Sequence, residues 1–309
     1  MKMANVTAAN TDEILRLHKP RGAAIALILD SPHSRSEFPA DLVTTVDRDT
    51  LRRSEDCFIP ELFSGATAIG AHLLEAMFPR TYVDLNRKRD EIDVSMFEGA
   101  WCGPVDLESS SVRRESGLFW KTCYPNLSIY SGKLKINDAV FRITNYYEPY
   151  HEYLAKMIDK LRVAHRAVYH LNCHSMPTVS SGEKSPEGSL GSKRPMVNLG
   201  DRNGTSCSAS FTSFLYARFQ DLGYDTTINV PYNAAFLTSG YPNPTDKRNS
   251  IQIELRRDIY MTELTFLPNA GFPKLQSDIL RILLDLRNWI LDSKSAALTF
   301  ADISERRPK

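Results

Sequence analysis

The 309-residue sequence predicts an α/β fold with a mixed, mostly parallel central sheet flanked by helices. One observation is the continuous apolar run at residues 22–29, which is typical of a strand buried on both faces, as in parallel sheets. Another is that strand-like runs alternate along the chain with segments of helical periodicity. The composition, 42% hydrophobic and 24% charged, is ordinary for a globular protein of this size.

Five segments are predicted to be strands of this sheet. In chain order they are GAAIALIL (22–29), TYVDL (81–85), AVYHLNC (167–173), TTINVPY (226–232) and IQIEL (251–255). Helical periodicity predicts the intervening helices over residues 61–77, 139–164 and 208–222. Residues 274–293 then form a packed amphipathic helix, with one apolar face made by Ile279, Leu283, Leu286 and Ile290.

Two loop-rich insertions interrupt this alternation, near residues 88–136 and 176–200. The second contains the stretch SMPTVSSGEKSPEGSLGSKRP, whose composition is typical of a flexible loop. Long loops inside a compact α/β domain usually form lids or substrate walls. We therefore expect residues 1–309 to form a single domain that carries both insertions.

The charge and cysteine content exclude several classes of protein. A formal net charge of +1 predicts no general attraction to nucleic acid or to an anionic membrane. The N-terminus lacks an apolar signal segment, and the run AAIALIL is too short to span a bilayer. The five scattered cysteines show no CxxC spacing, which argues against a disulfide framework or a cysteine-rich zinc site. We expect a cytoplasmic protein, and its oligomeric state stays open.

Polar residues gather where the predicted strands end. His33 follows the first strand, Arg87 follows the second, His174 follows the third, and Glu254 lies on the last, just before Arg256. Because ligands bind beyond the carboxyl ends of strands in open α/β sheets, we expect these side chains to lie close together. Two imidazoles, a carboxylate and a guanidinium are the groups that a metal-dependent hydrolase needs. No HExxH motif is present, so a helix-borne zinc site is not indicated.

Several motifs together resemble those of the N-formylglutamate amidohydrolase family. In family order they are SPHSRSEFP, RRSEDCFIPELF, YVDLNR, RITNYYEPYHEYL, NCHSMP, INVPYNAAF and IQIELRRDIYM, and they span roughly residues 25–263. That family is similar in fold to zinc carboxypeptidases and aspartoacylases. The resemblance therefore implies a zinc-exopeptidase-like (phosphorylase/hydrolase-like) fold.

The resemblance also implies roles for individual residues. His33 and His174 look like ligands of Zn²⁺ or another divalent metal, with Arg87 as oxyanion stabiliser and Glu254 as general acid/base. Asp56 is the preferred third ligand. The alternative is Glu37, which follows the first histidine more closely, as the carboxylate does in carboxypeptidases.

Four of these residues also have a structural interpretation, which for Glu254 is a solvated side chain. His33 would then bond a loop carbonyl, His174 would pack in the core, and Arg87 would pair with Asp84, which we expect to organise its turn. The remaining histidines carry no catalytic motif and are expected to be structural: His18, His72, His151, His165 and His170.

A formylglutamate-like substrate carries two carboxylates, so arginines are expected around its pocket. Arg142 and Arg256 lie in family-like blocks, and Arg114 and Arg89 are further candidates. Tyr232 is a candidate to line the pocket and donate a hydrogen bond. Surface salt bridges for the arginines and plain packing for the tyrosine are the alternatives.

The sequence departs from the family pattern at four positions. Arg35 and the pair Ala234–Ala235 stand where the family often has glycine, and Asn172 stands where it often has Asp. We expect alanine to change the shape of the loop, because it tolerates positive φ less well than glycine. Asn172 removes a carboxylate that would support the metal site.

The resemblance implies hydrolysis of the amide C–N bond of N-formyl-L-glutamate, to formate and L-glutamate, in histidine breakdown. One alternative is a related deacylase or carboxypeptidase-like hydrolase with another substrate. The other is a non-catalytic homologue that binds a metal or ligand, although binding alone would need neither Glu254 nor Arg87.

Overall fold

The fold is built around a seven-stranded sheet in this computed structural model, which describes residues 14–123, 126–180 and 191–305. The strand order is β1-β3-β2-β8-β11-β9-β10. The bounds are β1 (Leu15–His18), β2 (Leu27–Ser31), β3 (His72–Ala76), β8 (Val168–Met176), β9 (Val197–Gly200), β10 (Thr226–Ile228) and β11 (Arg248–Arg256). Only the β1–β3 and β9–β11 pairs are antiparallel among the paired strands of this sheet. The predicted mixed, mostly parallel sheet is confirmed.

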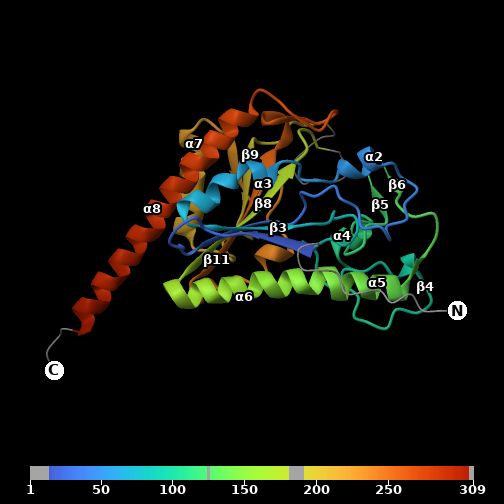
Figure 1. Cartoon of the computed structure of the whole chain (residues 1–309), viewed down its shortest axis with the longest axis horizontal. Coiled ribbons are helices and arrows are strands. Elements are labelled where there is room, and N and C mark those ends of the chain that lie inside the picture. The colour runs from blue at the N-terminus through green and yellow to red at the C-terminus, as the bar shows by residue number, and fades with distance from the viewer. Residues whose placement is uncertain (1–13, 124–125, 181–190, 306–309) are drawn as a thin grey trace.

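Helices cover both faces of the sheet (Figure 1). On one face lies α6 (Glu148–His165), whose Tyr150 and Leu154 belong to the same buried cluster as Ile28 of β2. The other face is covered by α3 (Ile59–Leu62), α7 (Ala209–Asp221) and α8 (Phe272–Glu305). Each face therefore has its own apolar core, as the α/β prediction requires.

The two faces of the central strands differ in chemistry. In β8, Leu171 and Cys173 join the core beneath α7 and α8. The alternate residues His170, Asn172 and His174 point to the opposite face, because successive side chains of a strand alternate. All three are buried. A row of polar side chains therefore crosses the middle of the sheet.

Three of the four predicted helices are confirmed. The 139–164 helix is α5 (Ile136–Arg142) continued by the π-helix η3 (Ile143–Tyr147) and α6. The 208–222 helix is α7, and the predicted apolar face of 274–293 is buried in α8.

The shorter elements are α2 (Arg48–Arg52), η2 (Val94–Met96), β4 (Phe97–Glu98), α4 (Ser110–Arg113), β5 (Thr122–Cys123), β6 (Leu127–Ser128), β7 (Leu134–Lys135), η4 (Phe236–Thr238), η5 (Pro244–Asp246), η6 (Arg257–Ile259), β12 (Met261–Thr262) and β13 (Leu267–Pro268).

The predicted helix at 61–77 is wrong. Its residues form the end of α3, then the 3₁₀ helix η1 (Ser64–Ile69), and finally strand β3. Gly70 makes the break, since it has φ of +94° and a Cβ there would lie 2.6 Å from the carbonyl oxygen of Ala23. The apolar residues that follow continue as a strand rather than a helix because the sheet buries them between β1 and β2.

One further strand prediction is wrong, and two strands were not predicted. The segment 81–85 is a buried turn, in which Tyr82, Val83 and Leu85 are fully enclosed. Strand β1 was not predicted, and β9 lies inside the predicted insertion at 176–200, of which residues 181–190 fall outside the described part. Runs of four residues are too short for periodicity to identify.

Among the described helices, none combines the length and apolar character that a membrane span requires.

Candidate functional site

The candidate site lies at the carboxyl ends of the parallel strands. The loop after β2 supplies His33, β8 supplies His174, and the segment between α2 and α3 supplies Asp56. Glu254 of β11 is paired in register with His174. The sheet thus brings together residues that are far apart in the sequence, as the strand-end argument predicts.

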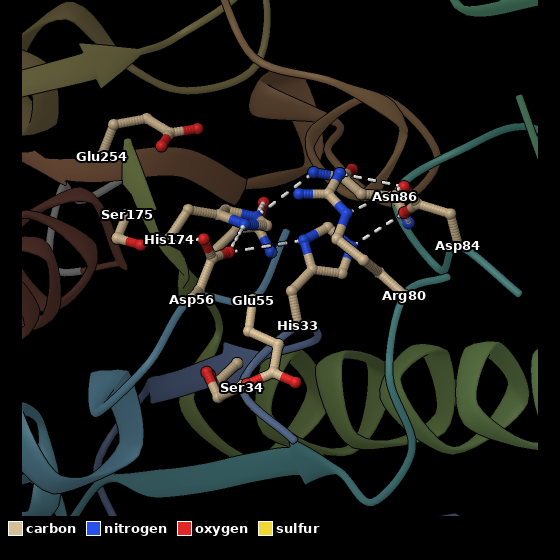
Figure 2. Close-up of polar contacts among 12 residues, drawn as sticks. His33, Ser34, Glu55, Asp56, Arg80, Asp84, Asn86, His174, Ser175 and Glu254 are labelled. Atoms are coloured by element: carbon tan, nitrogen blue, oxygen red, sulfur yellow. Dashed lines mark hydrogen bonds and ion pairs between the residues drawn. The ribbon is translucent and has the colours of Figure 1, made fainter. Parts of the chain in front are cut away.

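Both imidazoles turn one nitrogen toward Asp56 (Figure 2). The Oδ2 atom of Asp56 lies 2.9 Å from Nδ1 of His174 and 3.4 Å from Nδ1 of His33. The three groups offer ligand atoms that all lie within 4.8 Å of one another, and the side chains are at most 3% exposed. This arrangement of two histidines and a carboxylate is able to hold a metal ion.

The remaining nitrogen of each histidine is held by a second group. Nε2 of His33 lies 2.8 Å from Oδ1 of Asp84, and Nε2 of His174 lies 2.7 Å from Oδ1 of Asn172. Nδ1 of His33 is buried without a hydrogen-bond partner. A buried imidazole nitrogen without a partner is costly, and a metal ion bound there would use its lone pair. The residues present therefore fit a metal.

Asp56 is anchored through its other oxygen. Oδ1 accepts a hydrogen bond of 2.9 Å from Ser175 and lies 3.6 Å from the Arg257 guanidinium. Arg257 also donates to the backbone carbonyls of Arg53 and Glu55. Burial opposes the charge of Asp56, but His174 and His33 outweigh it and hold the pKa of this carboxyl well below its usual range. Asp56 therefore presents an ionised oxygen to both imidazoles.

Asp84 does more than organise its turn. Besides His33, it accepts hydrogen bonds from Arg80, from the Trp120 indole and from the backbone N–H of Asn86. Burial opposes its charge, but the neighbouring cations, Arg80 foremost, hold its pKa well below the usual range. Asp84 thus remains an acceptor that orients His33.

Arg80 is a site residue that the sequence reasoning missed. Its Nη2 atom lies 2.9 Å from Oδ2 of Asp84, and its charge acts on both Asp56 and Glu254. The predicted oxyanion donor Arg87 instead donates to the backbone carbonyls of Ser116 and Asn86, and lies 3.9 Å from Asp84. The signal available in the sequence is an arginine two residues before YVDLNR.

Glu254 is buried beside the histidines. Its Oε1 atom accepts a hydrogen bond of 2.6 Å from the Gln252 amide, on the same face of β11. Burial and the nearby charge of Asp56 raise the pKa of Glu254 to about 8. A carboxyl group with a pKa near neutrality is suited to exchanging protons.

The arginines predicted for substrate binding have other partners. Arg142 stacks on the Tyr82 ring at 4.2 Å and donates to the Tyr82 carbonyl, and Arg256 bonds Asp258 and the Arg194 carbonyl. Arg114 is exposed at the end of α4. Arg89, the fourth candidate, pairs with Glu148. Their substrate roles stay predictions, and the structure does not gather them around the histidines.

Tyr232 is 36% exposed, and the Arg194 guanidinium lies 5.7 Å from its ring. Burial of the hydroxyl raises its pKa, and the charge of Glu254 contributes in the same direction. Tyr232 therefore lies within electrostatic reach of the site.

Glu37, the alternative third ligand, and Ala234, a departure from the family pattern, lie as follows in the structure. Glu37 is 71% exposed and lies 3.9 Å from Arg35, which itself bonds Glu75 at 2.6 Å. The carboxylate that joins the two histidines is thus Asp56. Ala234 adopts φ of +87°. Alanine therefore adopts at this position the left-handed conformation that glycine favours.

Comparisons with known proteins agree on one family. The profile described as N-formylglutamate amidohydrolase matches residues 25–261. N-formylglutamate deformylase of Pseudomonas putida is 26% identical over 82% of this chain and 86% of its own length. The Pseudomonas aeruginosa deformylase is 24% identical over 89% of this chain and 96% of its own.

Solved structures give the same picture. The crystal structure of N-formylglutamate amidohydrolase from Ralstonia eutropha aligns with a TM-score of 0.86 and 34% identity, over 91% of this chain and 99% of that one. A protein from Agrobacterium tumefaciens shares the fold, with a TM-score of 0.64 and 18% identity over 91% of this chain and 96% of its own.

Proposed function

The chain belongs to the N-formylglutamate amidohydrolase family, and we propose that it hydrolyses the amide C–N bond of N-formyl-L-glutamate to formate and L-glutamate. The names of the two deformylase relatives support this substrate. The observation that carries the proposal is the buried group of His33, Asp56 and His174, in which Nδ1 of His33 has no hydrogen-bond partner.

We propose zinc as the resident metal, held by His33, Asp56 and His174. Two imidazoles and one carboxylate are a common ligand set of catalytic zinc, which keeps a further position open for water or substrate. When bound, such an ion lowers the pKa of water and polarises the substrate carbonyl.

Glu254 is the proposed proton shuttle. It is the buried carboxyl group that shares the register of His174, and its raised pKa allows it both to accept and to release a proton near neutrality. It would take the proton from the attacking water and deliver it to the nitrogen of the departing glutamate. Arg80 and Arg87 are the proposed donors to the developing oxyanion. The charge of Arg80 acts on Glu254, which supports its role in particular.

The test combines metal content with an amide-substrate screen of the wild type and Glu254→Gln. The wild type is expected to bind a divalent metal, to release glutamate from formylglutamate and to lose turnover in the presence of a chelator. Glu254→Gln is expected to keep the metal and to lose kcat by about 10²–10⁴-fold. The matched control is Glu75→Gln, which removes another buried carboxylate, on β3, and is expected to retain turnover.

Three results would contradict the proposal. Undiminished turnover of Glu254→Gln excludes the proton shuttle. Turnover of other N-acylamino acids alone favours the related deacylase. A bound metal without turnover of any amide indicates a binding protein.

We further propose that the reaction serves histidine breakdown, that it takes place in the cytoplasm and that the chain acts as one domain.

A further inference from the structure

A chain of buried polar groups leads away from His174 across the sheet. Asp30 of β2 is paired in register with Asn172 of β8, two residues before His174. His170 lies two residues farther from His174 on the same face, and Tyr150 of α6, which covers that face, also bonds Asp30. Asp30 and Asn172 are both 0% exposed.

Asp30 is an acceptor on both of its oxygens. Oδ1 accepts from Nδ2 of Asn172 at 2.7 Å and lies 2.9 Å from Nε2 of His170, while Oδ2 accepts from the Tyr150 hydroxyl at 3.0 Å. Burial opposes its charge, but His170 and Asn172 outweigh burial and lower the pKa of Asp30. An ionised carboxylate has no proton to donate, so each of its neighbours must be the donor.

This fixes the orientation of the Asn172 amide. Because Nδ2 must point at Asp30, Oδ1 must point at His174, whose Nε2 lies 2.7 Å away. A carbonyl oxygen only accepts, so Nε2 of His174 carries the proton. Nδ1 of His174, the nitrogen that faces Asp56, then keeps its lone pair.

A competing arrangement exists in the same place. Nδ2 of Asn86 lies 3.2 Å from Nε2 of His174 and would donate to it if that nitrogen were unprotonated. The histidine proton would then sit on Nδ1 and point at Asp56, where it would exclude a metal. That arrangement requires the Asn172 amide to flip and to place its oxygen 2.7 Å from the Asp30 carboxylate, which is repulsive.

We infer that Asp30 is a positioning residue which, through the Asn172 amide, holds His174 in the tautomer that leaves Nδ1 free for the metal. The inference rests on the proposed function only in that it needs the metal site, and it does not depend on the substrate. Groups that orient metal-binding histidines typically change metal affinity by 10–100-fold.

The test measures Zn²⁺ affinity of the metal-free protein by competition with a chromophoric chelator. Asp30→Asn keeps the shape of the side chain but lets the Asn172 amide take either orientation, so the affinity is expected to fall by about tenfold. The exchange variant Asp30→Asn/Asn172→Asp returns one carboxylate, now directly against Nε2 of His174, and is expected to restore the affinity. A purely structural role would not give this rescue. Glu75→Gln is the control and is expected to bind Zn²⁺ as the wild type does.

Should Asp30→Asn fail to fold, Asn172→Ala cuts the same link while leaving Asp30 with His170 and Tyr150, and it is expected to lose affinity in the same way. The inference is overturned if Asp30→Asn or Asn172→Ala binds Zn²⁺ within twofold of the wild type, or if the exchange variant binds no better than Asp30→Asn. If the variants show the expected Zn²⁺ affinities but the wild type does not hydrolyse formylglutamate, only the proposed substrate is overturned. Turnover with unchanged affinity in Asp30→Asn would overturn this inference alone.

Discussion

His151 makes the stability of the folded chain depend on pH. Its ring lies among those of Tyr147, Phe236 and Tyr241, Nδ1 is bonded to the Tyr241 hydroxyl, and Nε2 is buried without a hydrogen-bond partner. Burial lowers the pKa of His151 from its ordinary 6.5 to about 4. The unfolded chain therefore takes up this proton at a higher pH than the folded chain does.

The sign and size of the effect follow from linkage. The pKa is depressed in the folded state, so the contribution is complete above pH 6.5 and is lost as the pH falls toward 4. Each pH unit between these values costs about 1.4 kcal/mol. At pH 5 the folded state should have lost about 2 kcal/mol relative to pH 8 from this residue alone.

The assay is urea unfolding of the wild type and His151→Asn at pH 8, 7, 6 and 5. Asparagine keeps an acceptor for the Tyr241 hydroxyl and does not titrate. The wild type should lose about 2 kcal/mol more than the variant between pH 8 and pH 5. If the two free energies of unfolding run parallel across this range, the ring is not held neutral and the reasoning fails.

Three further predictions concern catalysis and backbone strain. Arg80→Gln should lower kcat about 10²-fold in steady-state kinetics. The loss should exceed that of Arg87→Gln, because the Arg87 guanidinium bonds backbone carbonyls. A larger loss for Arg87→Gln would make Arg87 the main oxyanion donor. Ala234→Gly should raise the free energy of unfolding by about 0.5–1 kcal/mol, since φ of +87° strains alanine, and an unchanged urea midpoint would contradict this. Gly70→Ala should lower it by about 2 kcal/mol or more because the added Cβ meets the Ala23 carbonyl oxygen, and a variant with wild-type thermal stability would exclude that contact.

Site residues could be predicted from the sequence where they belong to short motifs at the ends of strands. His33 and His174 could be found because a strand that ends in an imidazole is visible in the sequence alone. Asp56 could be chosen over Glu37 only through the resemblance, and the structure places it between the two imidazoles. Arg80 and Asp30 were missed as site residues because their roles depend on which strands and turns become neighbours.

The errors in secondary structure have a similar origin. Residues 72–76 are apolar enough to satisfy either a helix or a buried strand, and only pairing with β1 and β2 decides between them. The segment 81–85 is equally apolar, yet it turns, because Asp84 binds His33 and Arg80 instead of continuing a ladder. In both places contacts distant in sequence outweigh local propensity.

The pairing of β8 with β11 has a consequence for how this enzyme family can diversify. The two strands are joined from Val168–Arg248 to Met176–Arg256, and within that ladder His174 stands opposite Glu254. Their separation is therefore set by backbone hydrogen bonds, which no surface substitution alters. Substitutions in the surrounding loops are therefore expected to change the shape of the pocket while the spacing between imidazole and carboxylate stays the same.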